Sequence, residues 1–308
     1  MGIDLHNLAL LGHAQDRGAR FEQTIGIGRQ ALFVDPRELE QHRRLRGLPP
    51  LRQAEPEPGR ARYFEPLMAQ WFGAVTVDSV DASPYEQATV VHDMNLPWPA
   101  GRGGAGGYDA VLDFGCLEHV FDFPVAWRNC VALCRVGGHV LHSLPANNLA
   151  GHGFYQFSPE LFFNLYRPEN GFALVGVWFA QKADPKHWWQ VVDPLAVRRR
   201  VTLRNAHEVY MLVVAKKLAD VAAMPPPQQS DYAQQAWLAP PQPGASGQQQ
   251  SPGSAGGAGQ ALAALGLLDA ARAMRERLRG LAASGVGLPP PDYQRIVLAD
   301  LLRRAAPR

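Results

Sequence analysis

The sequence predicts an α/β protein built on a doubly wound, mostly parallel sheet. Near-continuous apolar runs such as residues 172–180 alternate with helical patterns, which is typical of parallel strands covered on both faces. The 308 residues are 46% apolar and 19% charged, enough to bury a sizeable core. Carboxylates also follow successive predicted strands, where such sheets bind ligands.

Each element follows from a local pattern. Runs of β-branched and apolar residues predict strands at 21–25, 74–80, 88–92, 108–114, 138–144, 172–180 and 208–215. A helix is expected from Asp35, an acidic N-cap followed by Pro36, and further helices at 124–134 and 159–166. No long helix separates the last two strands, which allows an antiparallel pair at the sheet edge.

The composition changes near Met224, which divides the chain into a main domain (1–223), a linker (224–260) and a C-terminal segment (261–308). The linker holds seven Pro, nine Gln and a single charged residue, so we expect it to be flexible. Helical patterns at 261–281 and 291–304 flank a turn and predict a helical hairpin. A basic hairpin can bind a protein partner, although packing on itself or on the main domain is favoured. We expect the main domain to fold without residues 224–308.

Composition and charge exclude several classes of protein. A net charge of +2 gives no reason to expect nucleic-acid binding. The longest strongly apolar run has nine residues, whereas a membrane-spanning helix needs about 20. Three cysteines do not make a disulfide framework and fit a reducing compartment. With no signal peptide visible, we expect a cytoplasmic protein.

Four strings follow one another along the main domain: Asp93-Met94-Asn95-Leu96-Pro97-Trp98-Pro99, Tyr108-Asp109-Ala110-Val111, Leu117-Glu118-His119-Val120 and Gly137-Gly138. Together they resemble the class I S-adenosylmethionine-dependent methyltransferases, in particular the type 11-like branch. The string at 145–161 is similar to a bacterial branch of that family. The resemblance spans about residues 20–216. It implies a Rossmann-like, seven-stranded sheet in which the last strand is inserted antiparallel.

The resemblance implies S-adenosylmethionine as the cofactor. The family's glycine loop matches at Gly26 and Gly28, but Thr24 replaces the usual acid and Gln30 the third glycine. Asp81, after the second strand, is expected to accept from the ribose hydroxyls, and Asp93, after the third, from the adenine amino group. The complete set of expected cofactor-binding residues is Gly26, Gly28, Asp81, Asp93, Met94 and Glu118.

The acceptor side is expected beside the next two strand ends. His119 is a candidate general base, but Glu118-His119 is equally typical of a helix N-terminus. His152 and Tyr155 are further catalytic candidates. Asn147, Asn148 and Gln156 are expected to contact the acceptor, with turn chemistry as the alternative reading.

Other motifs receive structural interpretations. Cys130 and Cys134 could join His119 on a metal, but core packing is favoured and no metal is expected. His142 is expected to be a hydrogen-bonded buried group. The glycine-rich stretch 101–107 is expected to be a surface loop. Residues 186–189 and 198–200 are expected to cap an anionic acceptor or to form a solvated loop.

The sequence therefore predicts methyl transfer to a small-molecule or glycan-related acceptor in a bacterial protein. The alternative is a non-catalytic methyltransferase-like module that binds partners through its tail. A nicotinamide-dependent oxidoreductase is disfavoured, because no Gly-x-Gly-x-x-Gly follows a strand.

Overall fold

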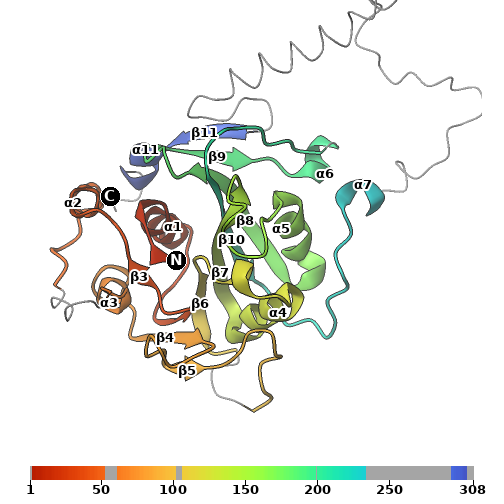
Figure 1. Cartoon of the computed structure of the whole chain (residues 1–308), viewed down its shortest axis with the longest axis horizontal. Coiled ribbons are helices and arrows are strands. Elements are labelled where there is room, and N and C mark those ends of the chain that lie inside the picture. Colours follow the sequence, from red (N-terminus) through yellow and green to blue (C-terminus); the bar gives the residue numbers. More distant parts are fainter. Residues whose placement is uncertain (1, 53–60, 102–105, 199, 234–292, 304–308) are drawn as a thin grey trace, which may run out of the picture.

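A computed structural model describes residues 2–52, 61–101, 106–198, 200–233 and 293–303. Its centre is a nine-stranded sheet in the order β11-β9-β8-β10-β7-β6-β2-β4-β5 (Figure 1). The strands are β2 (Gln23–Ile27), β4 (Thr76–Asp81), β5 (Val90–Val91), β6 (Tyr108–Asp113), β7 (Cys134–Asn147), β8 (Phe172–Gln181), β9 (His187–Val191), β10 (Val209–Lys217) and β11 (Tyr293–Val297). A separate two-stranded parallel pair joins β1 (Gly2–Ile3) to β3 (Ala31–Leu32).

The sheet confirms part of the expected topology. Strands β5, β4, β2, β6 and β7 are parallel neighbours, and β10 lies antiparallel between β7 and β8. This is the Rossmann-like arrangement with an inserted antiparallel strand. The expected strand number was wrong, since β9 and β11 extend the sheet to nine strands with mixed orientation. The β8–β10 pair is antiparallel as expected but lies inside the sheet, not at its edge.

Helices cover both faces of the sheet, as the apolar strands require. One face packs against α4 (Phe123–Leu133) and α5 (Pro159–Leu165), and the other against α1 (Leu5–Asp16) and α3 (Glu65–Phe72) (Figure 1). Strand β10 shows the alternation directly, because Met211 and Val213 belong to the first core and Leu212 and Val214 to the second. The remaining helices are α2 (Pro36–Leu45), η1 (Leu117–His119), η2 (Pro168–Asn170), α6 (Pro194–Val197) and α7 (Ser230–Ala233).

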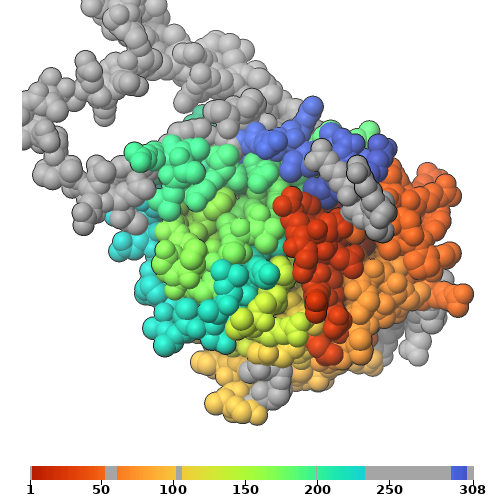
Figure 2. Space-filling view, turned by 180° about the vertical axis from the view of Figure 1, so that it is seen from behind, coloured from red at the N-terminus to blue at the C-terminus, as the bar shows by residue number. Residues whose placement is uncertain are grey.

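The expected helical hairpin was wrong in its last segment. Residues expected to start the helix at 291–304 form β11, which pairs antiparallel with β9, and only α11 (Leu298–Arg303) is helical. Leu298 and Leu302 are buried in the same core as α1. In Figure 2 the C-terminal residues (blue) lie against the N-terminal segment (red). The expected helix at 261–281, the turn after it and most of the linker lie outside the described residues.

The segment between the last two predicted strands was also misjudged. Trp188 and Trp189 are buried in β9 and do not cap a ligand. The Trp188 indole donates to His6 Nδ1, and His6 Nε2 lies 3.2 Å from the Gln181 carbonyl, so α1 is tied to the sheet. Arg200 pairs with Asp231 at the surface. Residue 199 and most of the glycine-rich stretch 101–107 lie outside the described residues.

Candidate functional site

The loops that follow β2, β4 and β6 meet at one edge of the sheet, because these strands are parallel neighbours. The Gly28 amide donates to the Val80 carbonyl at 2.7 Å, which joins the glycine loop to the end of β4. Gly28 has φ +75°, and a side chain there would lie 3.9 Å from the Cys116 thiol just after β6. Three of the expected strand ends therefore lie together at one edge of the sheet.

The glycine loop is held by its own side chains. A Cβ on Gly26 would lie 3.0 Å from the Gly28 carbonyl oxygen and 3.1 Å from the Phe64 ring, so a side chain there would require both neighbours to shift. The Gln30 amide donates to the Ile27 carbonyl at 2.7 Å, and the Thr24 hydroxyl donates to the Phe21 carbonyl. The two residues that depart from the family pattern thus stabilise the loop itself.

The carboxylates after β4 and β5 differ in their surroundings. Asp81 ends β4, where its carboxylate accepts from the Ser83 amide and stays partly exposed. Asp93 is exposed, and its carboxylate accepts two hydrogen bonds from Asn95, which lower the Asp93 pKa. Met94 is buried against Asn129. Of these residues, Asp81 lies close enough to Cys116 for its charge to raise the pKa of that thiol.

Acidic groups converge on the loop after β6. Desolvation raises the pKa of the Cys116 thiol, and Asp113, Glu118 and Asp81 add to that rise in this order. Asp113 also accepts from the backbone amides of Cys116 and Leu117, which fixes the start of η1.

Asp113 belongs to a buried hydrogen-bonded chain. His142 Nδ1 lies 2.7 Å from the Asp113 carboxylate, and His142 Nε2 lies 2.6 Å from the Tyr166 hydroxyl. All three side chains are buried. The expectation that His142 is a hydrogen-bonded buried group is confirmed. Cys130 and Cys134 are buried in the core, as expected.

Glu118, His119 and His152 are brought together beside this chain. Glu118 is fully buried, and its Oε1 lies 3.4 Å from His152 Nε2 and 3.8 Å from His119 Nε2. Desolvation, followed by the charge of Asp113, raises the Glu118 pKa to about 8. Desolvation, followed by His152, lowers the His119 pKa. Because these residues follow neighbouring strands, the sequence predicted that they lie close together, but it did not indicate that Glu118 is buried.

The loop after β7 covers Glu118. The Phe154 amide donates to the Glu118 carbonyl at 2.7 Å, and a Cβ on Gly153 would lie 2.8 Å from Glu118 Cγ. The expected substrate-binding side chains hold this loop in shape. Asn147 and Asn148 bond to residues 205–207, Gln156 accepts from the Leu149 amide, and Tyr155 donates to the Phe121 carbonyl. Contact of these four residues with an acceptor remains a prediction.

Two exposed aromatic rings, which the sequence analysis missed, adjoin the two histidines along the chain. Phe121 is 75% exposed and Phe154 is 69% exposed, and their ring centroids lie 6.3 Å apart, edge to face. The sequence feature that could have indicated these rings is the position of Phe121 directly after the Leu-Glu-His-Val string. Large exposed apolar side chains that cluster in this way are typical of binding surfaces.

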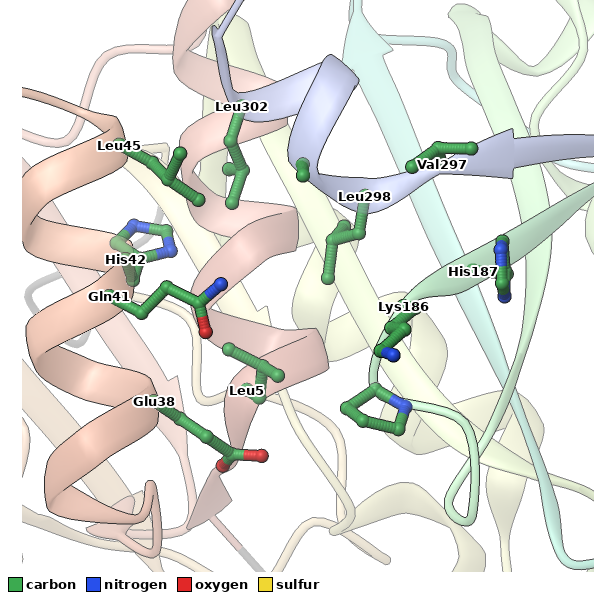
Figure 3. Close-up of a pocket in the computed structure, with 12 residues that line it drawn as sticks. Leu5, Glu38, Gln41, His42, Leu45, Lys186, His187, Val297, Leu298 and Leu302 are labelled. Atoms are coloured by element: carbon green, nitrogen blue, oxygen red, sulfur yellow. The ribbon is translucent and has the colours of Figure 1, made fainter.

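A separate cavity of about 280 Å³ lies between α1, α2, α11 and the start of β9 (Figure 3). Its walls are mostly apolar, with Leu5, Leu45, Leu298 and Leu302 around the buried His42 ring. Lys186 and His187, from the segment expected to cap an acceptor, line it, but none of the expected cofactor-binding, catalytic or substrate-binding residues does. Asp81, Glu118, His119 and His152 lie instead at and beside the carboxyl ends of β4 and β6, so we place the candidate active site there.

No family model matches the chain, and neither does any curated protein. Among solved structures, it is similar to the Burkholderia thailandensis 1,6-didemethyltoxoflavin-N1-methyltransferase with bound 1,6-didemethyltoxoflavin and S-adenosylhomocysteine (16% identity, 70% of this chain and 78% of that chain, TM-score 0.37). It is also similar to a putative sarcosine dimethylglycine methyltransferase from Galdieria sulphuraria (9% identity, 69% and 84%, TM-score 0.38).

A third similar structure is the [4+2]-cyclase SpnF (10% identity, 68% of this chain and 79% of that chain, TM-score 0.37). Proteins with different activities thus stand among the matches, and the likeness is distant. The functional assignment therefore depends on this chain's own strand order and side chains. Among the described residues, no helix combines the length and apolar character needed to cross a lipid bilayer.

Proposed function

We propose that this protein transfers a methyl group from S-adenosylmethionine to a small-molecule acceptor. The observation that carries the proposal is the convergence of Gly28, Asp81 and η1 at the carboxyl ends of β2, β4 and β6. In doubly wound sheets this crevice binds nucleotide-like cofactors, and a glycine with positive φ lets the backbone approach them closely. Asp81 is the ribose ligand in this proposal, and the surrounding carboxylates suit a cationic sulfonium.

The acceptor lies beside His119, His152 and Tyr155 in this proposal, against Phe121 and Phe154. Methyl transfer is an in-line displacement at the sulfonium methyl, and the main task of the protein is to align donor and acceptor. His119 is half exposed, and its lowered pKa keeps it neutral near pH 7, so it is able to take a proton from an acceptor. The aromatic rings favour a planar, apolar acceptor over a glycan.

Calorimetric titration with S-adenosylmethionine and S-adenosylhomocysteine tests the proposal. The parent protein should bind both, and Asp81→Asn should bind them at least about tenfold more weakly, because a charged acceptor is lost. Asp93→Asn should have a smaller effect, since that carboxylate is exposed and bonded to Asn95. Asp300→Asn, in α11, is the matched control and should leave both affinities unchanged.

The alternative is a non-catalytic module with the same fold. The observation that favours it is the Gln30 side chain, which bonds across the glycine loop to the Ile27 and Gly28 carbonyls. Absence of binding in the parent protein, together with recovered binding in Gln30→Gly, would support this alternative and overturn methyl transfer.

A further inference from the structure

Three side chains from two separate segments present possible metal ligands to one another. Glu118 and His119 come from η1, and His152 comes from the loop after β7. One ligand atom from each lies within 4.8 Å of the other two. Nothing in the proposed methyl transfer requires all three groups to point at a common centre.

The hydrogen bonding of this cluster is incomplete. Neither carboxylate oxygen of the fully buried Glu118 has a hydrogen-bond partner among the described residues, nor does the buried His152 Nε2. Burying a carboxylate without partners is costly, and desolvation raises its pKa accordingly. A bound cation would complete the coordination of the carboxylate and the imidazole together.

The spacing fits a first-row divalent metal. Zinc binds imidazole nitrogen and carboxylate oxygen at about 2.0–2.2 Å, so ligand atoms in a tetrahedral site lie roughly 3.4 Å apart. The observed separations from Glu118 Oε1 are 3.4 Å to His152 and 3.8 Å to His119. Two imidazoles and one carboxylate are a ligand set that suits zinc and other first-row metals and does not suit magnesium or calcium.

Both segments that carry the ligands are held in place. Asp113 accepts from the backbone amides at the start of η1, and the Phe154 amide donates to the Glu118 carbonyl. Gly153 packs directly on Glu118, where a Cβ would be in collision. The three groups are therefore positioned before any ion binds, which lowers the ordering cost of coordination.

We propose that Glu118, His119 and His152 bind one divalent transition-metal ion, zinc in the first instance, with an open coordination position. The side chains of His119 and His152 are 48% and 35% exposed, so the open side of the site faces solvent. Three protein ligands and one free position are typical of catalytic zinc sites. The metal site stands independently of methyl transfer. If the proposed function also holds, His119 is a metal ligand in the loaded protein and not the general base, and the free position is available to an acceptor oxygen.

The experiment uses the full-length protein after removal of metal with a chelator. Calorimetry with Zn²⁺ should show one ion per chain, and Co²⁺ should give the visible absorption of a low-symmetry site. His119→Ala, His152→Ala and Glu118→Gln should each weaken binding at least about tenfold. The control is His187→Ala, which removes another His–carboxylate pair, 2.8 Å from Asp184, and should leave affinity unchanged. Thermal unfolding of each variant shows that it is folded, and His119 is exposed enough for its replacement to be tolerated.

Zinc affinity that is unchanged in both His119→Ala and His152→Ala would overturn the metal site. Absence of binding in the parent would do the same, leaving Glu118 as a neutral acid beside His152. Titration of the metal-free protein with S-adenosylhomocysteine separates the two proposals. Zinc binding without cofactor binding would support the metal site and count against methyl transfer, and the reverse result would do the opposite.

Discussion

The Glu118 carboxylate should make stability depend on pH in an unusual direction. Its pKa is raised from 4.5 to about 8 by desolvation, so the folded state keeps a proton that the unfolded state has already lost. In metal-free protein, the contribution of Glu118 to the free energy of unfolding should fall between about pH 5 and pH 8, by at most about 4 kcal/mol. Urea unfolding of the parent and of Glu118→Gln at these two pH values measures this contribution as the difference between the two proteins. Relative to the variant, the parent should lose stability as the pH rises. A difference that does not change with pH would contradict the assignment.

Tyr166 is expected to support the site through His142. Tyr166→Phe leaves His142 Nε2 buried without its 2.6 Å partner, which should lower the free energy of unfolding by about 1–3 kcal/mol. Cofactor affinity should stay the same, because the Asp113 bonds to the start of η1 are unaffected. Urea unfolding and cofactor titration test both statements. Tyr155→Phe is the matched control, since its hydroxyl donates to a loop carbonyl in an exposed hydrogen bond, whose loss should cost less.

At the scale of residues, the sequence predicted the location of the site better than the hydrogen-bond partners and burial of its side chains. Parallel strands end at a common edge, so the residues after them could be assigned to one crevice. The partners of Asn147 and Asn148 could not, because residues 205–207 approach from a segment almost 60 positions away. The burial of Glu118 depends on Gly153, a contact that no local pattern indicates.

At the scale of elements, the strands with strong apolar runs were predicted and the elements with mixed surroundings were missed. Helix α1 is buried on most sides, and its His6 and Asn7 bond to backbone carbonyls, which hides the amphipathic period. Strand β11 and α11 together resemble one helix, because the apolar residues from Ile296 to Leu302 suit either structure. Pairing with β9 stabilises residues 293–297 as a strand. This contact is long-range, so the local sequence does not indicate it.

Deletion of residues 293–308 should destabilise the fold, contrary to the expectation that residues 224–308 are not needed. The deletion removes the buried Leu298 and Leu302 side chains and leaves the β9 edge unpaired. Two buried leucines correspond to about 3–6 kcal/mol. Thermal unfolding should show the loss, and the open edge should promote self-association. Deletion of residues 240–250, within the predicted linker, is the control and should leave the melting temperature unchanged. Equal stability of the two deletions would mean that β11 and α11 only rest on the surface.

At the scale of the whole molecule, the helices on the α1 side of the sheet and the sheet itself contain histidines that are buried in the neutral form. Desolvation lowers the pKa of His13 in α1, His42 in α2 and His139 in β7 to about 4 in each case. The unfolded chain takes up these protons near pH 6.5, whereas the folded protein resists until about pH 4. The free energy of unfolding should therefore fall as the pH is lowered through this window.

Each of these histidines contributes at most about 3 kcal/mol to that loss, and Glu118 acts in the opposite direction. The metal-free protein should consequently be most stable where the opposing contributions of the histidines and of Glu118 balance, at about pH 6–7. His42→Leu tests the acid side, because it removes one protonation site and leaves an apolar group beside Trp71 and the cavity of Figure 3. Urea unfolding from pH 7 to pH 4 should show a shallower decline in this variant than in the parent. Parallel curves for the two proteins would mean that His42 becomes protonated without unfolding, and that its burial does not set the acid limit of the fold.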